Sequence, residues 1–355
     1  MSPRWRVPLL AAAGAGLLGG LYTALIRLGL AVPDRTADGG AAHGPVMVLG
    51  FVGTLVALER AVALGARWAL LAPAGSGLGG LVLLAGGPGW AGLLLLSAGG
   101  AGLLAVYRAL WRRQASVALL AQAAGALCWY AATLLWLGGL PADRVAPWLA
   151  GFVVLTIAGE RLELARVALG PDHRGAEAWF LAASGAVPVG AAAGLLWPGA
   201  GAHLWGLALL GLVGWLAVFD VARHTVRGRG LPRYVAAGLL AGYGWLAVAG
   251  LLWAGGGAVA DGPRYDAALH AVFLGFTMSM IFAHAPVILP AVLRRPLPYH
   301  PVLYAPLALL HLALLVRLGL GDWAALVPIW QWAGVAGEVA IAGFAACAVT
   351  LAVRR

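Results

Sequence analysis

The sequence predicts an all-α membrane protein that crosses the bilayer twelve times. Of its 355 residues, 62% are hydrophobic and 10% are charged, and the mean hydropathy is +0.91. A soluble domain carries about 25% charged residues, so this composition is typical of a chain embedded in lipid. Apolar runs of about 20 residues, the length that crosses a bilayer as a helix, follow one another along the chain. These runs have to be helical because the bilayer core offers no water to backbone N–H and C=O groups.

Twelve segments satisfy this criterion. The first follows a basic start, and we interpret it as a mature span instead of a cleaved signal. The second, sixth and tenth carry a repeated motif, and the eleventh and twelfth each hold a polar side chain within their apolar length. In chain order the predicted helices are 7–28, 44–65, 67–86, 88–108, 115–139, 145–168, 178–199, 201–222, 233–255, 267–293, 301–319 and 323–352.

The arginines predict the orientation. All 23 basic residues are arginine. If both termini are cytoplasmic, most arginines fall at cytoplasmic helix ends, which is the bias that the positive-inside rule predicts. We therefore expect a multi-pass protein of the inner cell membrane. The cytoplasmic arginines, which face anionic lipid headgroups, then account for the net charge of +10. No nucleic-acid partner is expected. The eighteen inner arginines are Arg4, Arg6, Arg60, Arg67, Arg108, Arg112, Arg113, Arg161, Arg166, Arg174, Arg223, Arg227, Arg229, Arg233, Arg294, Arg295, Arg354 and Arg355, and the five outer ones are Arg27, Arg35, Arg144, Arg264 and Arg317.

A short motif recurs in three of the predicted helices. GFVGTLVALER at 50–60 returns as GFVVLTIAGER at 151–161, an offset of 101 residues, and in altered form as GFTMSMIFAHA at 275–285. The carriers are the second, sixth and tenth helices, so the period is four helices. The alternative is a chance recurrence in a glycine-rich chain, because glycine lets membrane helices approach closely.

A four-helix period predicts the domain organisation. We expect a single transmembrane domain, 1–355, built from repeats 1–114, 115–232 and 233–355. All three copies of the motif run in the same direction across the membrane, so the repeats are parallel, with pseudo-threefold symmetry about the membrane normal.

The ninth residue after the motif's glycine is polar in every copy. It is Glu59 or Glu160 in the first two copies, each followed by an arginine, and His284 in the third. We expect Glu59–Arg60 and Glu160–Arg161 to form ion pairs near the cytoplasmic interface, where partial hydration lowers their cost.

Four of the eight histidines are candidate ligands. His43 and His270 begin the second and tenth helices at the outer side and form a candidate outer pair. His284 and His311 are expected at similar depth on neighbouring helices and form a candidate inner pair. Neutral imidazole suits haem iron and copper in this environment. The alternative for each is a hydrogen bond between helices.

Two methionines favour a rival chemistry. His43–Met47 and Met280–His284 are both spaced i, i+4, so the members of each pair share a helix face. Thioether with imidazole suits Cu(I), whereas methionine also fills irregular gaps in packed interiors. Copper bound by these four side chains and packing therefore both remain open.

Two acidic residues complete the candidates. Asp266 lies one turn before His270 and could orient its ring. Glu338, inside the last helix, is either a carboxyl group that handles protons, kept neutral by burial, or a hydrogen-bonded packing residue.

The histidine positions carry two family resemblances. Twelve helices with histidines at the outer ends of helices two and ten resemble subunit I of the haem-copper oxidases, in which one histidine from each of those helices holds a low-spin haem; His43 and His270 match. The sixth and seventh helices contain no histidine, so a binuclear oxygen-reducing centre is not expected.

The sequence is more similar to the NnrS family. HGPVMVLGF at 43–51 and HAVFLGFTMSMIFAH at 270–284 resemble the early and late histidine-led helices of that family. The resemblance implies haem, of the b type, with copper as a further candidate, and a role in tolerance of nitric oxide. It does not establish an enzyme.

Three hypotheses follow. The first is a haem-binding membrane protein with axial ligation by His43 and His270 and a second site at His284 and His311. The chain has no soluble domain and no CxxCH motif, so electrons would come from quinol or a separate electron-donor protein. The second is a copper or small-solute transporter that uses the His–Met pairs. The third is a structural membrane subunit without a cofactor.

Overall fold

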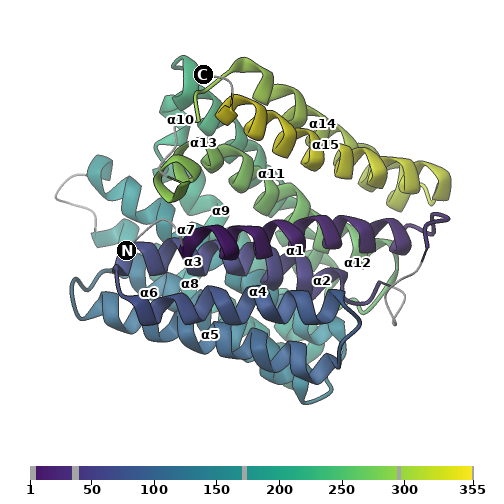
Figure 1. The fold of residues 1–355 in the computed structure, drawn as a ribbon, viewed down its shortest axis with the longest axis horizontal. Coiled ribbons are helices and arrows are strands. Elements are labelled where there is room, and N and C mark those ends of the chain that lie inside the picture. The colour runs from purple at the N-terminus through teal and green to yellow at the C-terminus, as the bar shows by residue number, and fades with distance from the viewer. Residues whose placement is uncertain (1–4, 34–39, 170–173, 294–296, 354–355) are drawn as a thin grey trace. The chain divides into compact units, whose positions relative to one another are not determined.

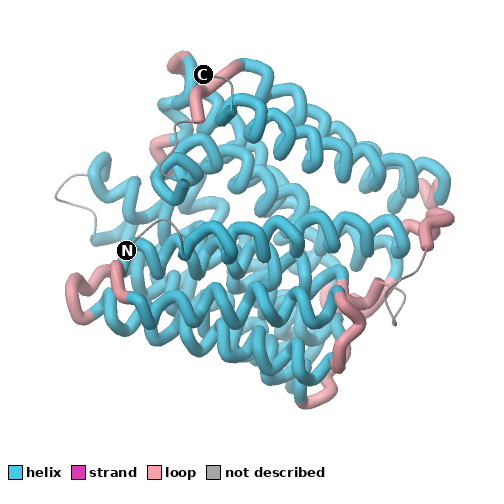
Figure 2. Tube along the Cα trace, in the orientation of Figure 1, coloured by secondary structure: helices cyan, strands magenta, loops and turns pink. Residues whose placement is uncertain are grey.

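The computed structural model describes residues 5–33, 40–169, 174–293 and 297–353 (Figure 1). Within these ranges every regular element is a helix and no strand is present (Figure 2). The predicted inner arginines Arg4, Arg294, Arg295, Arg354 and Arg355 and the outer Arg35 lie outside the described residues.

Twelve helical spans in the described ranges are long and apolar enough to cross a membrane. All twelve sequence-predicted helices are confirmed, with ends that shift by a few residues. The spans are Arg6–Arg27, His43–Leu64, Arg67–Leu84, Gly89–Trp111, Val117–Leu137, Ala142–Arg166, Arg174–Leu196, Pro198–Phe219, Gly230–Gly256, Gly262–Pro290, Pro301–Trp323 and Val327–Val353.

The chain forms two compact units, residues 1–153 and 154–355, and each is described by itself. The boundary falls within helix α7. The first unit contains α1 (Arg6–Arg27), α2 (His43–Pro45), η2 (Val46–Gly53), α3 (Thr54–Leu64), η3 (Arg67–Leu70), α4 (Leu71–Leu84), α5 (Gly89–Trp111), α6 (Val117–Leu137) and the start of α7 (Ala142–Leu169). The second contains the end of α7, α8 (Arg174–Leu196), α9 (Pro198–Phe219), α10 (Ala222–Thr225), α11 (Gly230–Gly256), α12 (Gly262–His270), η4 (Ala271–Met278), α13 (Ser279–Leu293), η5 (Pro301–Leu303), α14 (Tyr304–Val316), η6 (Arg317–Trp323) and α15 (Val327–Val353).

Glycine contacts hold the first unit together. A Cβ atom on Gly80 of α4 would lie 2.8 Å from the Cα atom of Gly50 on η2, so these two backbones touch. Ser76 donates a hydrogen bond to the carbonyl of Leu49 across the same contact at 2.7 Å. The hydrophobic effect does not drive helices together inside lipid. Small residues instead let the helix backbones approach closely, so that van der Waals packing and hydrogen bonds hold them together.

Larger side chains fill the second unit. In α9, the fully buried Trp215 donates to the carbonyl of Ala176 on α8 at 2.8 Å. Phe282 of α13 stacks on Phe344 of α15 with ring centroids 4.0 Å apart. Helices α14 and α15 lie side by side along their length (Figure 1).

Two π-helical segments mark the second and tenth spans. η2 and η4 are each eight residues long, and each contains the Gly-Phe pair of the repeated motif at the same position. The residue after each segment is a hydroxyl side chain, and Thr54 and Ser279 donate to the carbonyls of Gly50 and Gly275 respectively. π-Helical turns are rare in proteins as a whole, but those that occur are often found at functional sites. The two spans therefore share one local geometry in one sequence register.

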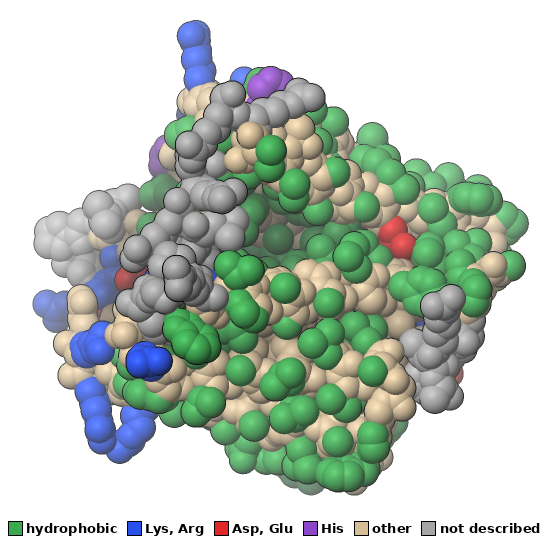
Figure 3. All heavy atoms as spheres, viewed as in Figure 1, with side chains coloured by type: hydrophobic (Ala, Val, Ile, Leu, Met, Phe, Trp, Pro, Cys, Tyr) green, Lys and Arg blue, Asp and Glu red, His purple; other side chains and the backbone are tan. Residues whose placement is uncertain are grey.

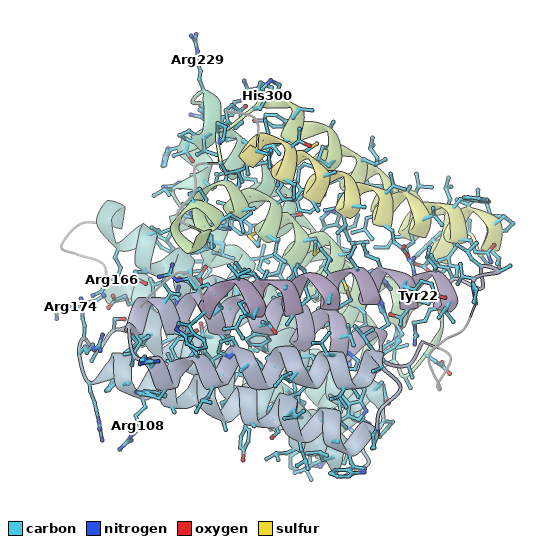
Figure 4. All side chains as sticks on the ribbon, viewed as in Figure 1. Tyr22, Arg108, Arg166, Arg174, Arg229 and His300 are labelled. Carbon is cyan, nitrogen blue, oxygen red and sulfur yellow. The ribbon has the colours of Figure 1, made fainter. Side chains whose placement is uncertain are left out.

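Apolar side chains cover the helix surfaces. Exposed leucine, valine and tryptophan side chains lie along the spans of both units, for example Leu18, Leu94, Leu315 and Trp332. Hydrophobic side chains cover much of the face drawn in Figure 3. Arg108 in the last turn of α5 and Arg229 before α11 point away from the helices (Figure 4). Each unit therefore exposes apolar side chains along its helices, as expected of helices that contact lipid.

Candidate functional site

A charged network in the second unit centres on Asp266 of α12. The Asp266 carboxylate accepts hydrogen bonds from Nε and Nη2 of Arg317, both at 3.0 Å, and from Trp330 Nε1 at 3.2 Å. Arg317 is 5% exposed, and its guanidinium lies 4.6 Å from the centre of the Trp330 ring. Two-pronged pairing and stacking are the contacts for which arginine is suited and lysine is not.

This network holds the imidazole of His270. Its Nδ1 lies 2.8 Å from the Asp266 carbonyl oxygen and 3.2 Å from Oδ1 of the Asp266 carboxylate. The contact expected from the one-turn spacing is therefore present. Both partners are acceptors, so Nδ1 carries the proton in the neutral ring and Nε2 keeps its lone pair. Histidine ligands of metals almost always have this arrangement, in which the other ring nitrogen donates to a carboxylate or carbonyl.

His43 has a related local geometry in the first unit. Its Nδ1 lies 2.9 Å from the carbonyl oxygen of Gly20 on α1. The side chain of Met47 packs against the same glycine, where a Cβ atom would collide with the thioether sulfur. Packing into this notch accounts for the position of Met47 without a metal.

His284 repeats this hydrogen bond deeper in the second unit. Its Nδ1 lies 2.7 Å from the carbonyl oxygen of Met280, and its Nε2 is buried with no hydrogen-bond partner among the described residues. The Met280 methyl group fills the space over Gly242 of α11. An orphaned buried nitrogen is costly, so His284 Nε2 is a candidate to meet a ligand.

In His311 the ring nitrogen Nδ1 accepts a hydrogen bond, whereas in the other three histidines it faces a carbonyl oxygen. Trp245 Nε1 donates to His311 Nδ1 at 2.9 Å, so the neutral ring carries its proton on Nε2. That nitrogen is therefore a donor and not a free ligand in this state. No hydrogen bond joins His284 and His311 in the described chain, and the geometry makes His311 the least suited of the four predicted ligands.

One predicted ion pair is present and the other is corrected. Arg60 pairs with Glu59 through Nε at 2.7 Å and Nη2 at 2.8 Å, as expected. Arg161 directs its Nε and Nη2 at Asp220, at 2.7 and 2.8 Å, and not at Glu160 as the adjacent positions led us to expect. Packing overrides adjacency here because Asp220 is buried with the guanidinium.

The Asp220 carboxylate is fully engaged. It also accepts from Tyr243 Oη at 2.8 Å and from the backbone N–H of Ala222 at 2.7 Å. A buried ion pair needs such additional hydrogen bonds to offset its desolvation. His284 interacts electrostatically with this pair. The sequence contains a signal for this cluster, since Asp220 is an acid at the end of an apolar helix, but no signal for its partners.

The candidate histidines occur singly in the described residues and not in a metal-binding cluster. Across residues 5–33, 40–169, 174–293 and 297–353, no three side chains of histidine, cysteine, aspartate and glutamate are placed to hold one metal ion. Haem iron needs one or two protein ligands, because the macrocycle supplies the other four. Single histidines with an oriented ring fit that need.

The fold and this site define an integral membrane protein with oriented intramembrane histidines. The chain belongs to the family described as a domain of unknown function (DUF8744), whose model matches residues 6–353. No curated protein and no solved structure matches it significantly.

Proposed function

We propose that this protein binds haem through histidines in its membrane-spanning helices, with His270 as the principal axial ligand. The observation that carries the proposal is the fixed ring of His270: Asp266 holds Nδ1, and Arg317 and Trp330 hold Asp266. A carboxylate behind the ring also raises the basicity of the ligating nitrogen. When bound, haem would supply redox chemistry or diatomic-gas binding, and the protein would supply the ligand and the surrounding charge.

His43 and His284 are further candidates, each taken by itself. Both direct Nδ1 at a backbone carbonyl, as His270 does. The similarity of 43–51 and 270–284 to NnrS sequences supports b-type haem and a role in the response to nitric oxide. Quinol or an electron-donor protein would be the source of electrons.

We also propose that both termini face the cytoplasm and that the chain contains three four-helix repeats. The excess of arginines at one set of helix ends supports the orientation. The matched positions of η2 and η4, with Thr54 and Ser279 bonded alike, support the repeat. Labelling of a cysteine introduced at Arg229 in sealed vesicles of known orientation would test the orientation.

The first experiment is an absorption spectrum of the detergent-purified protein, oxidised and reduced, with iron and copper measured on the same sample. The proposal predicts a Soret band, sharp bands after reduction, and iron without stoichiometric copper. The His270→Ala variant is expected to lose or shift these bands. His203→Ala is the matched control, because His203 is an exposed histidine of α9 whose Nδ1 also faces a backbone carbonyl, at 2.7 Å, without a carboxylate behind it. A colourless wild-type protein after expression with ample haem would rule the proposal out.

A further inference from the structure

Two carboxyl groups other than Asp266 belong to the elements around Arg317. Asp322 follows Arg317 by about one turn of the π-helical η6, and Glu338 lies on α15, which packs against η6. Asp322 is 9% exposed. Neither residue takes part in the hydrogen bonds that link Asp266 to Arg317 and Trp330. The mechanism of haem ligation makes no use of them.

Each of the two carboxyl groups has a buried oxygen without a donor. Asp322 Oδ2 and Glu338 Oε1 are inaccessible to solvent and have no hydrogen-bond partner in the described residues. A carboxylate buried without donors or a countercharge is strongly unfavourable, so the group protonates instead. An orphaned acceptor is also the atom at which a proton can bind.

The charge balance around Arg317 points the same way. The guanidinium already has a partner of opposite charge, because two of its nitrogens bond Asp266. Asp322 and Glu338 therefore add two negative charges for which the described network holds no matching cation, other than His270 if it were protonated. Ionised acids in this part of a membrane span are costly for the same reason as above.

Asp322 has a second reason to be neutral. Asp266, which is paired with Arg317, lies on α12, and α12 packs against η6. A second negative charge on this side of η6 would repel the Asp266 carboxylate. A proton on Asp322 removes that repulsion.

We propose that Asp322 and Glu338 form a proton-binding site beside Arg317 in the second unit. The site takes up one exchangeable proton on each carboxyl group, because Arg317 is already paired with Asp266 and gives neither group a countercharge of its own. It gives the protein a means to couple its membrane activity to proton movement. The site shares Arg317 and Asp266 with the network that orients His270, but its proton binding can be measured without haem.

A protein-bound metal cation is the rival occupant. The absence of any three metal-ligating side chains placed around one point, in the ranges the structure describes, disfavours it. A proton needs only one oxygen. The other titratable or charged side chains on η6, on α15 and on the elements packed against them are Arg264, Tyr265, His270, His284, Tyr304, His311 and Cys347.

Infrared difference spectroscopy on the full-length protein in liposomes tests the site directly. At about pH 6 ordinary carboxyl groups are ionised, because their pKa values lie near 4, so a protonated-carboxyl C=O band reports unusual groups. We expect that band in the wild-type protein, shifted in D₂O and lost as the pH is raised. Glu338→Gln and Asp322→Asn are each expected to remove about half of its intensity, and the double variant all of it.

Matched controls are available for both substitutions. Glu163→Gln and Asp261→Asn change exposed carboxylates and should leave the band unaltered. The pH titration of the wild-type protein decides the question even if a variant does not fold. A wild-type protein that lacks the band at about pH 6 would overturn the proposal. Saturable binding of sodium ions to the wild-type protein, lost in the Glu338→Gln variant, would also overturn it. Neither result would affect the haem spectrum, so the two proposals fail separately.

Discussion

Replacing Asp220 by asparagine should destabilise the second unit far more than a single lost hydrogen bond would. The substitution keeps the shape of the side chain but leaves the Arg161 guanidinium, 4% exposed, without a counterion in a buried site. Of the two charge-assisted bonds, at 2.7 and 2.8 Å, the asparagine oxygen can keep only one, and that one is no longer made to a charged carboxylate. Breaking a buried pair from one side costs roughly 3–5 kcal/mol, and we expect a decrease in unfolding free energy of that size.

A second substitution separates charge from shape. Asp220→Asn combined with Arg161→Met removes both charges, while the asparagine carbonyl can still accept from the Ala222 N–H and its NH₂ group can donate to Tyr243 Oη. Because a buried pair replaced as a whole is often close to neutral, the double variant should recover to within about 1 kcal/mol of the wild type. The two single variants and the double variant form a cycle whose coupling energy is the quantity of interest.

The assay is reversible unfolding in mixed micelles of increasing SDS content, followed by circular dichroism. Glu59→Gln is the matched control. The Glu59 side chain is 27% exposed, and a partly exposed pair is worth at most about 1 kcal/mol. The reasoning is refuted if Asp220→Asn costs no more than Glu59→Gln, or if adding Arg161→Met makes the protein less stable still.

Two further substitutions test the packing. Gly80→Ala places a Cβ atom 2.8 Å from the Cα atom it faces on η2, so it should cost about 1–3 kcal/mol in the same unfolding assay, whereas Gly14→Ala, with no atom within 4 Å, should cost nothing. Trp245→Phe leaves His311 Nδ1 without its donor and should cost about 1–3 kcal/mol, against a smaller effect of Trp179→Phe at an exposed hydrogen bond. Equal effects within either pair would contradict the contacts described.

The sequence was sufficient for the helices because their cause is local. Each span is an apolar run of bilayer length, and the backbone has no other way to satisfy its hydrogen bonds in lipid. Adjacency predicted the Glu59–Arg60 pair correctly, but the same reasoning failed for Glu160–Arg161, because a distant carboxylate is buried with Arg161. The π-helical form of η2 and η4 left no comparable sequence signal.

The site could be predicted only where its contacts are local. Asp266 precedes His270 by one turn, so their contact follows from helix geometry. Asp220 lies 59 residues from Arg161, and Trp245 lies 66 residues from His311. Such partners are brought together by tertiary packing, and composition or spacing alone does not identify them.

The most direct test of haem ligation is titration of the purified protein with haemin, followed by the Soret band. We predict saturable binding by the wild type and by His203→Ala, and none of comparable affinity by His270→Ala. Asp266→Asn should weaken binding by about 10–100-fold, because it removes the carboxylate that orients the ligand. Identical titration curves for the wild type and His270→Ala would contradict the account.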